Sequence, residues 1–372
     1  MKVAVTKGTL RVPPTYFALT HAEQMGSLHE FEVFCLVADI RASTSLPIHD
    51  YVPLRQLGFR RRELAMPGFI PRMVGGIRKF GPDVIHQHFG TWASAATYSA
   101  RRLGVPLVTT LHGADVFAFG REPLTAMAKW HHHNIRAVNE QSSRLLAVSN
   151  FLANEAVGAG LDAQKLEVHY QGIDTDYFTP ADAVESTTPE KEPILLFVGG
   201  LSERKGIRDL VQASLAVQPD SPHQLVIAGE GELRDEIRES VGSSPHVRLV
   251  GSQDRSAIRA LMRDAYALVV PSRTNNGWRE AAGLVALEAA ACGTPVIAND
   301  CGGLGEMMID GVTGMLVPEG SRPALTETIR EVLGLSPADY RAMSAAARSF
   351  AVGERSLSKS CAELASHYDD VV

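Results

Sequence analysis

The sequence contains few cysteines, no long apolar run and no excess of basic residues. Its four cysteines, among 372 residues, lack the spacing of a metal site, and we expect reduced thiols in a cytosolic protein. No run of about 18 apolar residues is present, so no membrane-spanning helix is expected. Met1 is followed by KVAVTKG, which is typical of a first strand and not of a signal peptide. The net charge of −6 gives no reason to expect nucleic acid as a partner.

Two enzyme motifs are also absent. No G-x-S-x-G turn occurs, which removes the usual serine nucleophile of a catalytic triad. The segment GEGELRDEI, from Gly229, lacks the third glycine of a dinucleotide-binding loop, and a tight turn before a helix is the preferred interpretation. The sequence therefore disfavours a dehydrogenase or a nucleotide-sugar epimerase.

The length and the hydrophobic pattern predict two α/β domains. A chain of 372 residues exceeds the size at which one core keeps growing. Short apolar strands alternate with helical patterns in both halves, which predicts doubly wound parallel sheets with helices on both faces. The expected strands lie near 2–6, 32–37, 83–86, 106–110, 145–148 and 166–169, and near 194–198, 224–228, 246–250, 267–270 and 295–298.

A polar, proline-containing segment at 179–193 is the natural linker. We therefore place one domain at 1–180, a second at 181–345, and a C-terminal helical segment at 346–372. In open α/β sheets the default ligand site lies beyond the carboxyl ends of the strands. With two such domains, we expect the site in the cleft between them.

The loop after the strand at 194–198 reads GGLSERKG. Gly199 and Gly200 permit close backbone approach, and Arg204 and Lys205 supply positive charge, as a phosphate would require. A solvated turn that simply ends a strand explains the same residues, and both interpretations stay open.

Two carboxylates lie in the otherwise apolar segment 275–298. Glu280 precedes a predicted helix that starts near Gly283, and Glu288 lies about one turn inside it. Because burying an unpaired carboxylate is costly, each needs a partner. The helix N-terminus suits a phosphate, and carboxylates accept hydrogen bonds from vicinal hydroxyls, so a nucleoside diphosphate sugar fits. A general acid and base pair, as in glycosidases, is the competing use.

Histidines follow two predicted strands of the N-terminal half. His112 and Asp115 come after the strand at 106–110, and His86 and His88 lie at the end of the strand at 83–86. His112 is interpreted as a hydrogen-bonding residue of the site, with a satisfied loop histidine as the alternative. Zinc is not expected, because no cysteine or carboxylate pattern accompanies the histidines.

Residues 51–80 carry seven basic residues and one acidic residue, interleaved with apolar ones. An anionic membrane surface would attract such a segment. A solvated helical face with snorkelling arginines is the alternative.

Several segments together resemble the retaining glycosyltransferases of family 4, which have the GT-B fold. REAAGLVALEAAACGTPVIANDCGGLGEMMIDGVTGMLVP is similar to the E-x7-E signature of that family and its continuation. FVGGLSERKG resembles the phosphate loop, VHYQGIDTDYFTP the segment before the linker, and HQHFG with TLHGADV the bacterial exopolysaccharide subgroup. The resemblance covers about residues 83–320.

The resemblance implies a hexosyltransferase that moves a sugar, with retention, from a UDP- or GDP-sugar to a glycan, lipid-linked or polysaccharide acceptor bound by the N-terminal domain. It implies no cofactor and no metal. Catalytic roles fall to His112, Lys205 and Glu280. Donor contacts fall to Gly199, Gly200, Arg204, Lys205, Gly251, Ser252, Glu280, Ala282, Gly283, Leu284, Val285 and Glu288. Acceptor contacts are expected from Gly8, Thr15, Tyr16, His88 and Asp115.

Two departures from the family pattern affect the donor loops. Gly200 stands where the family often has arginine, and Ala282 where it often has phenylalanine. The resemblance further implies that the C-terminal segment crosses back to the first domain. A peripheral position on the inner membrane face, a natural-product glycosyltransferase and a non-catalytic sugar-nucleotide binding protein remain open alternatives. The donor base, the sugar, the linkage and the oligomeric state are not encoded in any motif.

Overall fold

The computed structural model describes residues 1–372 except 13–15, 42, 54–57, 182–191 and 243, and of Phe59 and Arg60 only the backbone. The chain forms two compact units. One comprises Met1–Gln171 with Leu357–Val372, and the other comprises Gly172–Ser356. The boundaries expected from the sequence were 180/181 and 345/346. No helix of the described part of the chain is long and apolar enough to cross a membrane.

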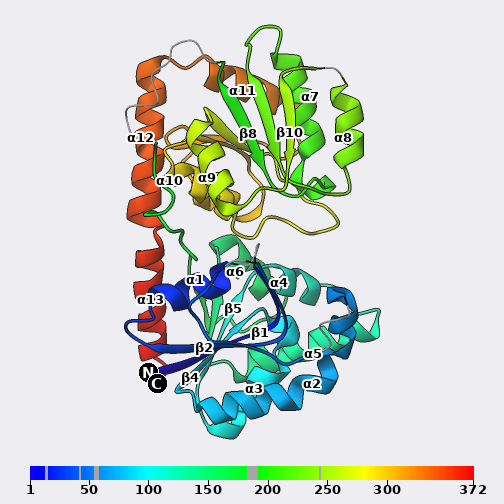
Figure 1. Cartoon of the computed structure of the whole chain (residues 1–372), viewed down its shortest axis with the longest axis vertical. Coiled ribbons are helices and arrows are strands. Elements are labelled where there is room, and N and C mark those ends of the chain that lie inside the picture. Colours follow the sequence, from blue (N-terminus) through cyan, green and yellow to red (C-terminus); the bar gives the residue numbers. More distant parts are fainter. Residues whose placement is uncertain (13–15, 42, 54–57, 182–191, 243) are drawn as a thin grey trace. The chain divides into compact units, whose positions relative to one another are not determined.

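The N-terminal unit contains a seven-stranded parallel sheet in the order β3-β2-β1-β4-β5-β6-β7. Its strands are β1 (Lys2–Val12), β2 (Glu30–Ile40), β3 (Ile48–Asp50), β4 (Val84–His88), β5 (Leu107–Leu111), β6 (Arg144–Ala147) and β7 (Leu166–Val168). Its helices are α1 (Phe17–Gln24), α2 (Phe59–Phe80), α3 (Ser94–Leu103), α4 (Ala114–Phe119), α5 (Ala126–Gln141), α6 (Asn150–Gly158) and α13 (Leu357–Asp369), with the 3-10 turn η1 (Gly90–Trp92) (Figure 1).

Alternation along β1 divides the core of this unit into two layers. Val3 and Val5 point to one face, where α1 and α13 cover them, whereas Ala4 points to the other face, under α2 and α3. The strands β4 and β5 are buried along their whole length, as parallel strands covered on both faces should be.

The second unit contains a six-stranded parallel sheet in the order β10-β9-β8-β11-β12-β13. Its strands are β8 (Ile194–Val198), β9 (Gln224–Ala228), β10 (Val247–Gly251), β11 (Ala267–Val270), β12 (Val296–Asn299) and β13 (Gly314–Val317). Its helices are α7 (Ile207–Val217), α8 (Arg234–Val241), α9 (Arg255–Asp264), α10 (Leu284–Ala291), α11 (Arg322–Leu333) and α12 (Pro337–Glu354), with the 3-10 turns η2 (Glu203–Lys205) and η3 (Gly302–Met307).

These two parallel sheets confirm the predicted fold class. The sequence did not predict β3 or β13. It predicted strands at 2–6 and 32–37, which are shorter than β1 and β2 as observed. The two strands pair in register from Lys2 opposite Glu30 to Val12 opposite Ile40, so backbone pairing carries both past their apolar runs. The four cysteines are buried free thiols.

Candidate functional site

The loop after β8 is built on glycines that no other residue replaces easily. Gly206 immediately precedes α7 with a φ of 64°, and a Cβ atom there would lie 1.9 Å from the carbonyl oxygen of Pro271. A Cβ at Gly229, after β9, would lie 1.8 Å from the carbonyl oxygen of Gly199. The strand-end loops therefore pack backbone against backbone. By contrast, a Cβ at Gly200 meets only a carbonyl oxygen at 3.8 Å, so this position has room for a side chain.

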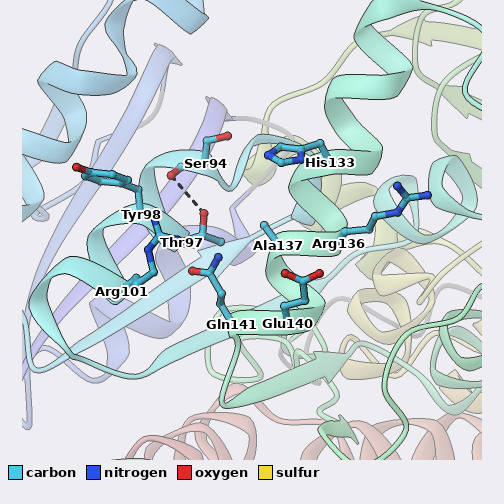
Figure 2. A pocket seen from close by; sticks show the side chains of 9 residues that line it. All are labelled: Ser94, Thr97, Tyr98, Arg101, His133, Arg136, Ala137, Glu140 and Gln141. Carbon is cyan, nitrogen blue, oxygen red and sulfur yellow. Dashed lines mark hydrogen bonds between the residues drawn. The ribbon is translucent and has the colours of Figure 1, made fainter.

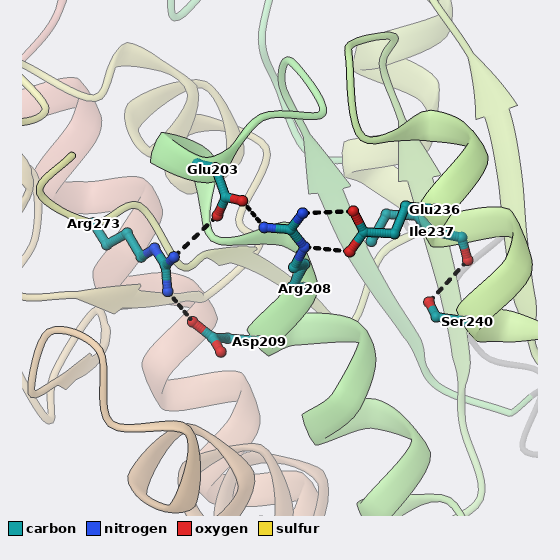
Figure 3. Close-up of polar contacts among 7 residues, drawn as sticks. All are labelled: Glu203, Arg208, Asp209, Glu236, Ile237, Ser240 and Arg273. Atoms are coloured by element: carbon teal, nitrogen blue, oxygen red, sulfur yellow. Dashed lines mark hydrogen bonds and ion pairs between the residues drawn. The ribbon is translucent and has the colours of Figure 1, made fainter. Parts of the chain in front are cut away.

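An ion-pair network fixes the same loop (Figure 3). Arg208 of α7 pairs with Glu203 and, through two nitrogens, with Glu236 of α8. Arg273 pairs with Glu203 at 3.0 Å and with Asp209 at 3.2 Å. Each pair is partly exposed and contributes little alone. Together they orient η2, which carries two of the predicted phosphate ligands.

Lys205, one of these two, contacts Glu280 directly. Its Nζ donates to Oε2 of Glu280 at 2.5 Å, and the Ser272 hydroxyl donates to the same oxygen at 3.1 Å. Burial opposes ionisation of Glu280, but the Lys205 ammonium and the two hydrogen bonds outweigh it and lower the pKa of this carboxyl. Glu280 therefore has partners in the protein at Oε2, and its contact with a ligand stays a prediction. Arg204 is exposed, and among the described residues it forms no ion pair.

Glu288 has a different environment on α10. No described residue donates a hydrogen bond to its carboxyl group. Burial raises its pKa to about 7, and the positive charge of Arg255 offsets this only in part. A carboxyl group without a donor inside a folded unit suits a ligand that brings hydroxyl donors.

The N-terminus of α10 lies beside Glu280. Gly283 precedes the helix with a φ of 71°, and a Cβ there would lie 2.4 Å from a methyl group of Leu304 and 3.8 Å from Cγ of Glu280. Ala282 is buried, and Leu284 and Val285 form the first turn of the helix. Free backbone N–H groups at this end are suited to an anion.

Gly251 is the last residue of β10, and Ser252 follows it at the same edge of the sheet. Gly251 has a φ of 72°, and a Cβ there would lie 3.0 Å from a carboxylate oxygen of Glu230. Glu230 follows β9 and pairs with Arg234 at 2.9 Å. The sequence analysis did not single out Glu230 or Ser272, although both lie at strand ends, where the parallel fold predicts a site.

In the N-terminal unit, His88 and His112 form a hydrogen bond. Nδ1 of His88 lies 3.0 Å from Nε2 of His112, and Nδ1 of His112 lies 3.4 Å from Nε2 of Gln171. The rings of Phe17 and Phe89 pack on His112 with centroid distances of 4.4 and 4.3 Å. Burial, then neighbouring cationic groups, lowers the pKa of both histidines well below the usual value. Both imidazoles are therefore neutral at neutral pH.

Asp115 organises the loops that carry these histidines. It is fully buried, and its oxygens accept hydrogen bonds from the backbone N–H groups of Gly90 at 3.0 Å and of His112 at 3.1 Å. Burial raises its pKa, and these backbone donors act against that rise. The structure thus gives Asp115 a role in joining the loops after β4 and β5, where the sequence predicted an acceptor contact.

The other predicted acceptor contacts lie at the start of the chain. Gly8 is inside β1, and a Cβ there would lie 2.4 Å from Cβ of Trp92, so glycine is required for this close packing. Tyr16 immediately precedes α1 and packs against the core. Thr15 lies outside the described residues.

Residues 51–80 do not present all their basic side chains to solvent. Arg62 is buried and pairs with Asp50 at 2.5 Å, so this arginine is unavailable to a membrane surface. Arg61, Arg72 and Leu64 are exposed on α2. Residues 54–57, within the same stretch, lie outside the described part.

One cavity of this unit is not part of the candidate site. A cavity of about 420 Å³ lies between α3 and α5, lined among others by Arg101, Arg136 and Glu140 (Figure 2). It is built from helix side chains away from the strand-end loops. Within the described part of the chain, no three histidine, cysteine, aspartate or glutamate residues are grouped as metal ligands.

Comparisons with known proteins agree with this architecture. Residues 15–177 match the family model described as Glycosyltransferase Family 4, and residues 179–350 match the model described as Glycosyl transferases group 1. A glycogen synthase of Mycobacterium tuberculosis is 32% identical over 74% of this chain and 66% of its own length. A D-inositol 3-phosphate glycosyltransferase of Mycolicibacterium smegmatis is 31% identical over 69% of this chain and 61% of its own length. The chain thus spans just under two thirds of these relatives.

Solved structures share the fold at low sequence identity. Anabaena HepE, solved in complex with UDP and glucose, has a TM-score of 0.77 and 17% identity, and the match covers 100% of both chains. The sucrose-phosphate synthase of Thermosynechococcus elongatus has a TM-score of 0.79 and 21% identity over 100% of this chain and 98% of its own. These structures show that the chain has the GT-B fold, and the two family models with the curated relatives show that it belongs to the family 4 glycosyltransferases.

Proposed function

We propose that this protein is a retaining hexosyltransferase that uses a nucleoside diphosphate sugar as donor. Glu288 is the observation that carries the proposal. It is a half-buried carboxyl group of the second unit with no described donor, one turn beyond the N-terminus of α10. Ribose hydroxyls would supply the missing hydrogen bonds. We favour UDP as the nucleotide of the donor, because UDP is named with the HepE structure, and GDP is second.

Positive charge for the leaving diphosphate is proposed to come from three sources. Arg204 is exposed, Lys205 is held by Glu280, and Gly283, at the N-terminus of α10, lies beside Glu280. Cationic groups aimed at the developing charge stabilise a dissociative transition state. With these charges in place, we propose that transfer requires neither a metal nor a cofactor. Glu280 is proposed to hold the donor sugar through Oε1, while its Oε2 accepts from Lys205 and Ser272.

His112 is proposed to contact the donor sugar from the N-terminal unit. Burial, then the charge of Lys7, lowers the pKa of His112, so its imidazole is neutral. A neutral imidazole can accept a hydrogen bond from a sugar hydroxyl or donate one to it. A glycan, lipid-linked or polysaccharide acceptor is proposed on this unit. The exposed residues Arg61, Leu64 and Arg72 of α2 would bring this unit to an anionic membrane surface.

Nucleotide binding tests the proposal on the full chain. UDP, GDP, ADP and dTDP are added with and without EDTA to the wild type, to Glu288→Ala and to the exposed α8 control Glu239→Ala, and the thermal shift is measured. Ligand at 100 times its dissociation constant should add about 2.7 kcal/mol. A selective shift that resists EDTA, is lost in Glu288→Ala and persists in Glu239→Ala is expected.

No shift with any nucleotide would refute the donor site. If a nucleotide binds, NMR of the sugar released or transferred from the matching donor reports the anomeric configuration. Inversion would contradict the retaining mechanism, and the absence of both transfer and hydrolysis would favour a non-catalytic binding protein.

A further inference from the structure

Both ring nitrogens of His112 have partners inside the N-terminal unit. Nε2 of His112 lies 3.0 Å from Nδ1 of His88, and Nδ1 of His112 lies 3.4 Å from the side-chain amide nitrogen of Gln171. All three residues belong to the same unit. A ligand can therefore bond to a nitrogen of His112 only by replacing one of these partners. The contact with Gln171 is the longer and weaker of the two, so it is the one that a ligand would replace.

The amide group of Gln171 determines which nitrogen of His112 carries the proton. An amide nitrogen donates hydrogen bonds and does not accept them, so Nδ1 of His112 accepts this bond and carries no proton. His112 is neutral, because burial, then neighbouring cationic groups, lowers its pKa well below the usual value. Its single ring proton therefore lies on Nε2, from which it is donated to Nδ1 of His88.

The ring of His112 is held in one orientation by its surroundings. The rings of Phe17 and Phe89 pack on it with centroid distances of 4.4 and 4.3 Å, and its backbone N–H donates to Oδ1 of Asp115 at 3.1 Å. Phe89 itself has a φ of 65°, a strain that persists where the surroundings enforce it and that is concentrated at functional sites. The position of the proton, and not a rotation of the ring, therefore decides what His112 offers to a ligand.

Gln171 can give way without disturbing a helix or a strand. Only 5% of the residue is exposed, but it belongs to no regular element and is the last residue of its unit before Gly172. A nitrogen acceptor left without a donor in a buried site is costly. The amide of Gln171 removes this cost while no ligand is bound, and a hydroxyl group would remove it equally well.

We propose that Gln171 is a positioning residue, which holds His112 as the Nε2–H tautomer until a hydroxyl group of the donor sugar replaces its amide at Nδ1. His88 is the second positioning residue, because its Nδ1 accepts the ring proton. The sugar hydroxyl donates and the imidazole accepts, so the contact selects a sugar that presents a hydroxyl group at this point and not a carboxylate. This inference rests on the proposed glycosyltransferase function and gives the direction of the hydrogen bond between His112 and the sugar.

NMR of the full chain with ¹⁵N-labelled histidine tests the tautomer without any ligand. The ¹⁵N chemical shift separates a protonated from an unprotonated ring nitrogen, and the signals missing from His112→Gln identify this residue. In the wild type we expect the proton on Nε2. Gln171→Glu, whose carboxylate accepts and does not donate, should place a proton on Nδ1. Gln164→Glu adds the same charge at an exposed position of the same unit and should change neither shift.

Gln171→Met keeps the length of the side chain without a charge, so it serves where a buried carboxylate prevents folding. It should give intermediate shifts, because no amide then fixes either tautomer. A proton on Nδ1 in the wild type overturns the inference, since Gln171 would then accept from His112. Wild-type shifts in both Gln171 variants overturn it as well, because the tautomer would not depend on this residue.

Calorimetry with UDP and UDP-glucose separates positioning of the sugar contact from a general structural role. Gln171→Glu should weaken the binding of UDP-glucose roughly tenfold, because one hydrogen bond to the sugar is lost, and should leave the affinity for UDP unchanged. Gln164→Glu should change neither affinity. Equal losses for the two ligands, or no loss for UDP-glucose, overturn the inference. If the wild type does not bind UDP, the donor site of the proposed function fails, whereas a proton on Nδ1 together with UDP binding refutes this inference alone.

Discussion

Glu280 and Glu288 are eight residues apart in the sequence, yet their pKa values are displaced in opposite directions. Both are partly buried, and burial opposes ionisation of both. Glu280 also contacts an ammonium and a hydroxyl, and these hold it ionised. Glu288 has only the more distant charge of Arg255, and its pKa rises to about 7. The contact with Lys205 therefore explains why the two pKa values differ. The sequence could not reveal this contact, because Lys205 is 75 residues from Glu280.

The lowered pKa of Lys7 predicts that this lysine lowers the stability of the fold, and its removal should show this. A pKa lowered from 10.5 to about 7 corresponds to at most about 5 kcal/mol. We therefore expect Lys7→Met to raise the free energy of unfolding at pH 7 by about 2–4 kcal/mol, measured by urea denaturation.

The pH dependence of that gain has a definite sign. The folded pKa of Lys7 lies below its unfolded value, so between pH 7 and 10.5 the unfolded chain binds more protons. Across this window the free energy of unfolding of the wild type should rise with pH relative to that of Lys7→Met. The stability advantage of Lys7→Met should therefore shrink toward pH 10.5. Lys2→Met, at the exposed end of β1, should show no such trend. A Lys7→Met variant that is less stable than the wild type at pH 7 would mean that the amine has a stabilising partner.

At the scale of an element, α2 places two adjacent glycines in opposite environments. A Cβ at Gly75 would meet nothing within 4 Å, whereas a Cβ at Gly76 would lie 1.7 Å from the hydroxyl oxygen of Tyr51 and 2.7 Å from its Cζ. Gly75→Ala should therefore raise the free energy of unfolding by about 0.5–1 kcal/mol, because alanine has the higher helix propensity. Gly76→Ala should lower it by about 1–3 kcal/mol, because Tyr51 must move.

Urea unfolding followed by tryptophan fluorescence measures the effects of Gly75→Ala and Gly76→Ala, since Trp92 and Trp130 belong to the same unit as α2. The double variant Gly76→Ala with Tyr51→Phe should recover part of the loss, because it removes the nearer clashing atom. Equal effects of alanine at the two positions would show that the helix face is not packed as described.

The strands show which elements a sequence pattern can locate. β8, β9 and β11 have the predicted bounds of 194–198, 224–228 and 267–270, because short apolar runs there end at glycine or proline. β3 was missed because Ile48–Asp50 has no apolar run, and it pairs at the edge of the sheet. The predicted donor loops lie together because parallel topology gathers strand ends at one edge of the sheet, and their role stays a prediction. The ion pairs of Glu203 with Arg208 and Arg273 were not found, since charged residues on a loop carry no label of their partners.

At the scale of the whole molecule, one unit is continuous in sequence and the other is not. Gly172–Ser356 has its own core and contains every predicted donor residue. The N-terminal unit needs α13, which follows the second unit in sequence. Tyr368 and Leu364 of α13 are buried in its core, and the Tyr368 hydroxyl lies 2.6 Å from Nδ1 of His86. His86 is neutral, because burial, then neighbouring histidines, lowers its pKa to about 3, so this contact adds no charge to the core.

This asymmetry predicts how the chain can be divided. Residues 172–356 expressed alone should fold and bind the same nucleotide as the full chain, with the same dependence on Glu288. Residues 1–171 alone should unfold readily, because the core face beneath α13 is exposed to water. Met1 and Val371 pack against the same core cluster, and the two termini are adjacent in Figure 1. Residues 357–372 joined by a short flexible linker to Met1 of 1–171 should therefore restore a cooperative urea transition. If residues 1–171 without α13 unfold at the same urea concentration as this permuted chain, α13 contributes no stability to the N-terminal unit.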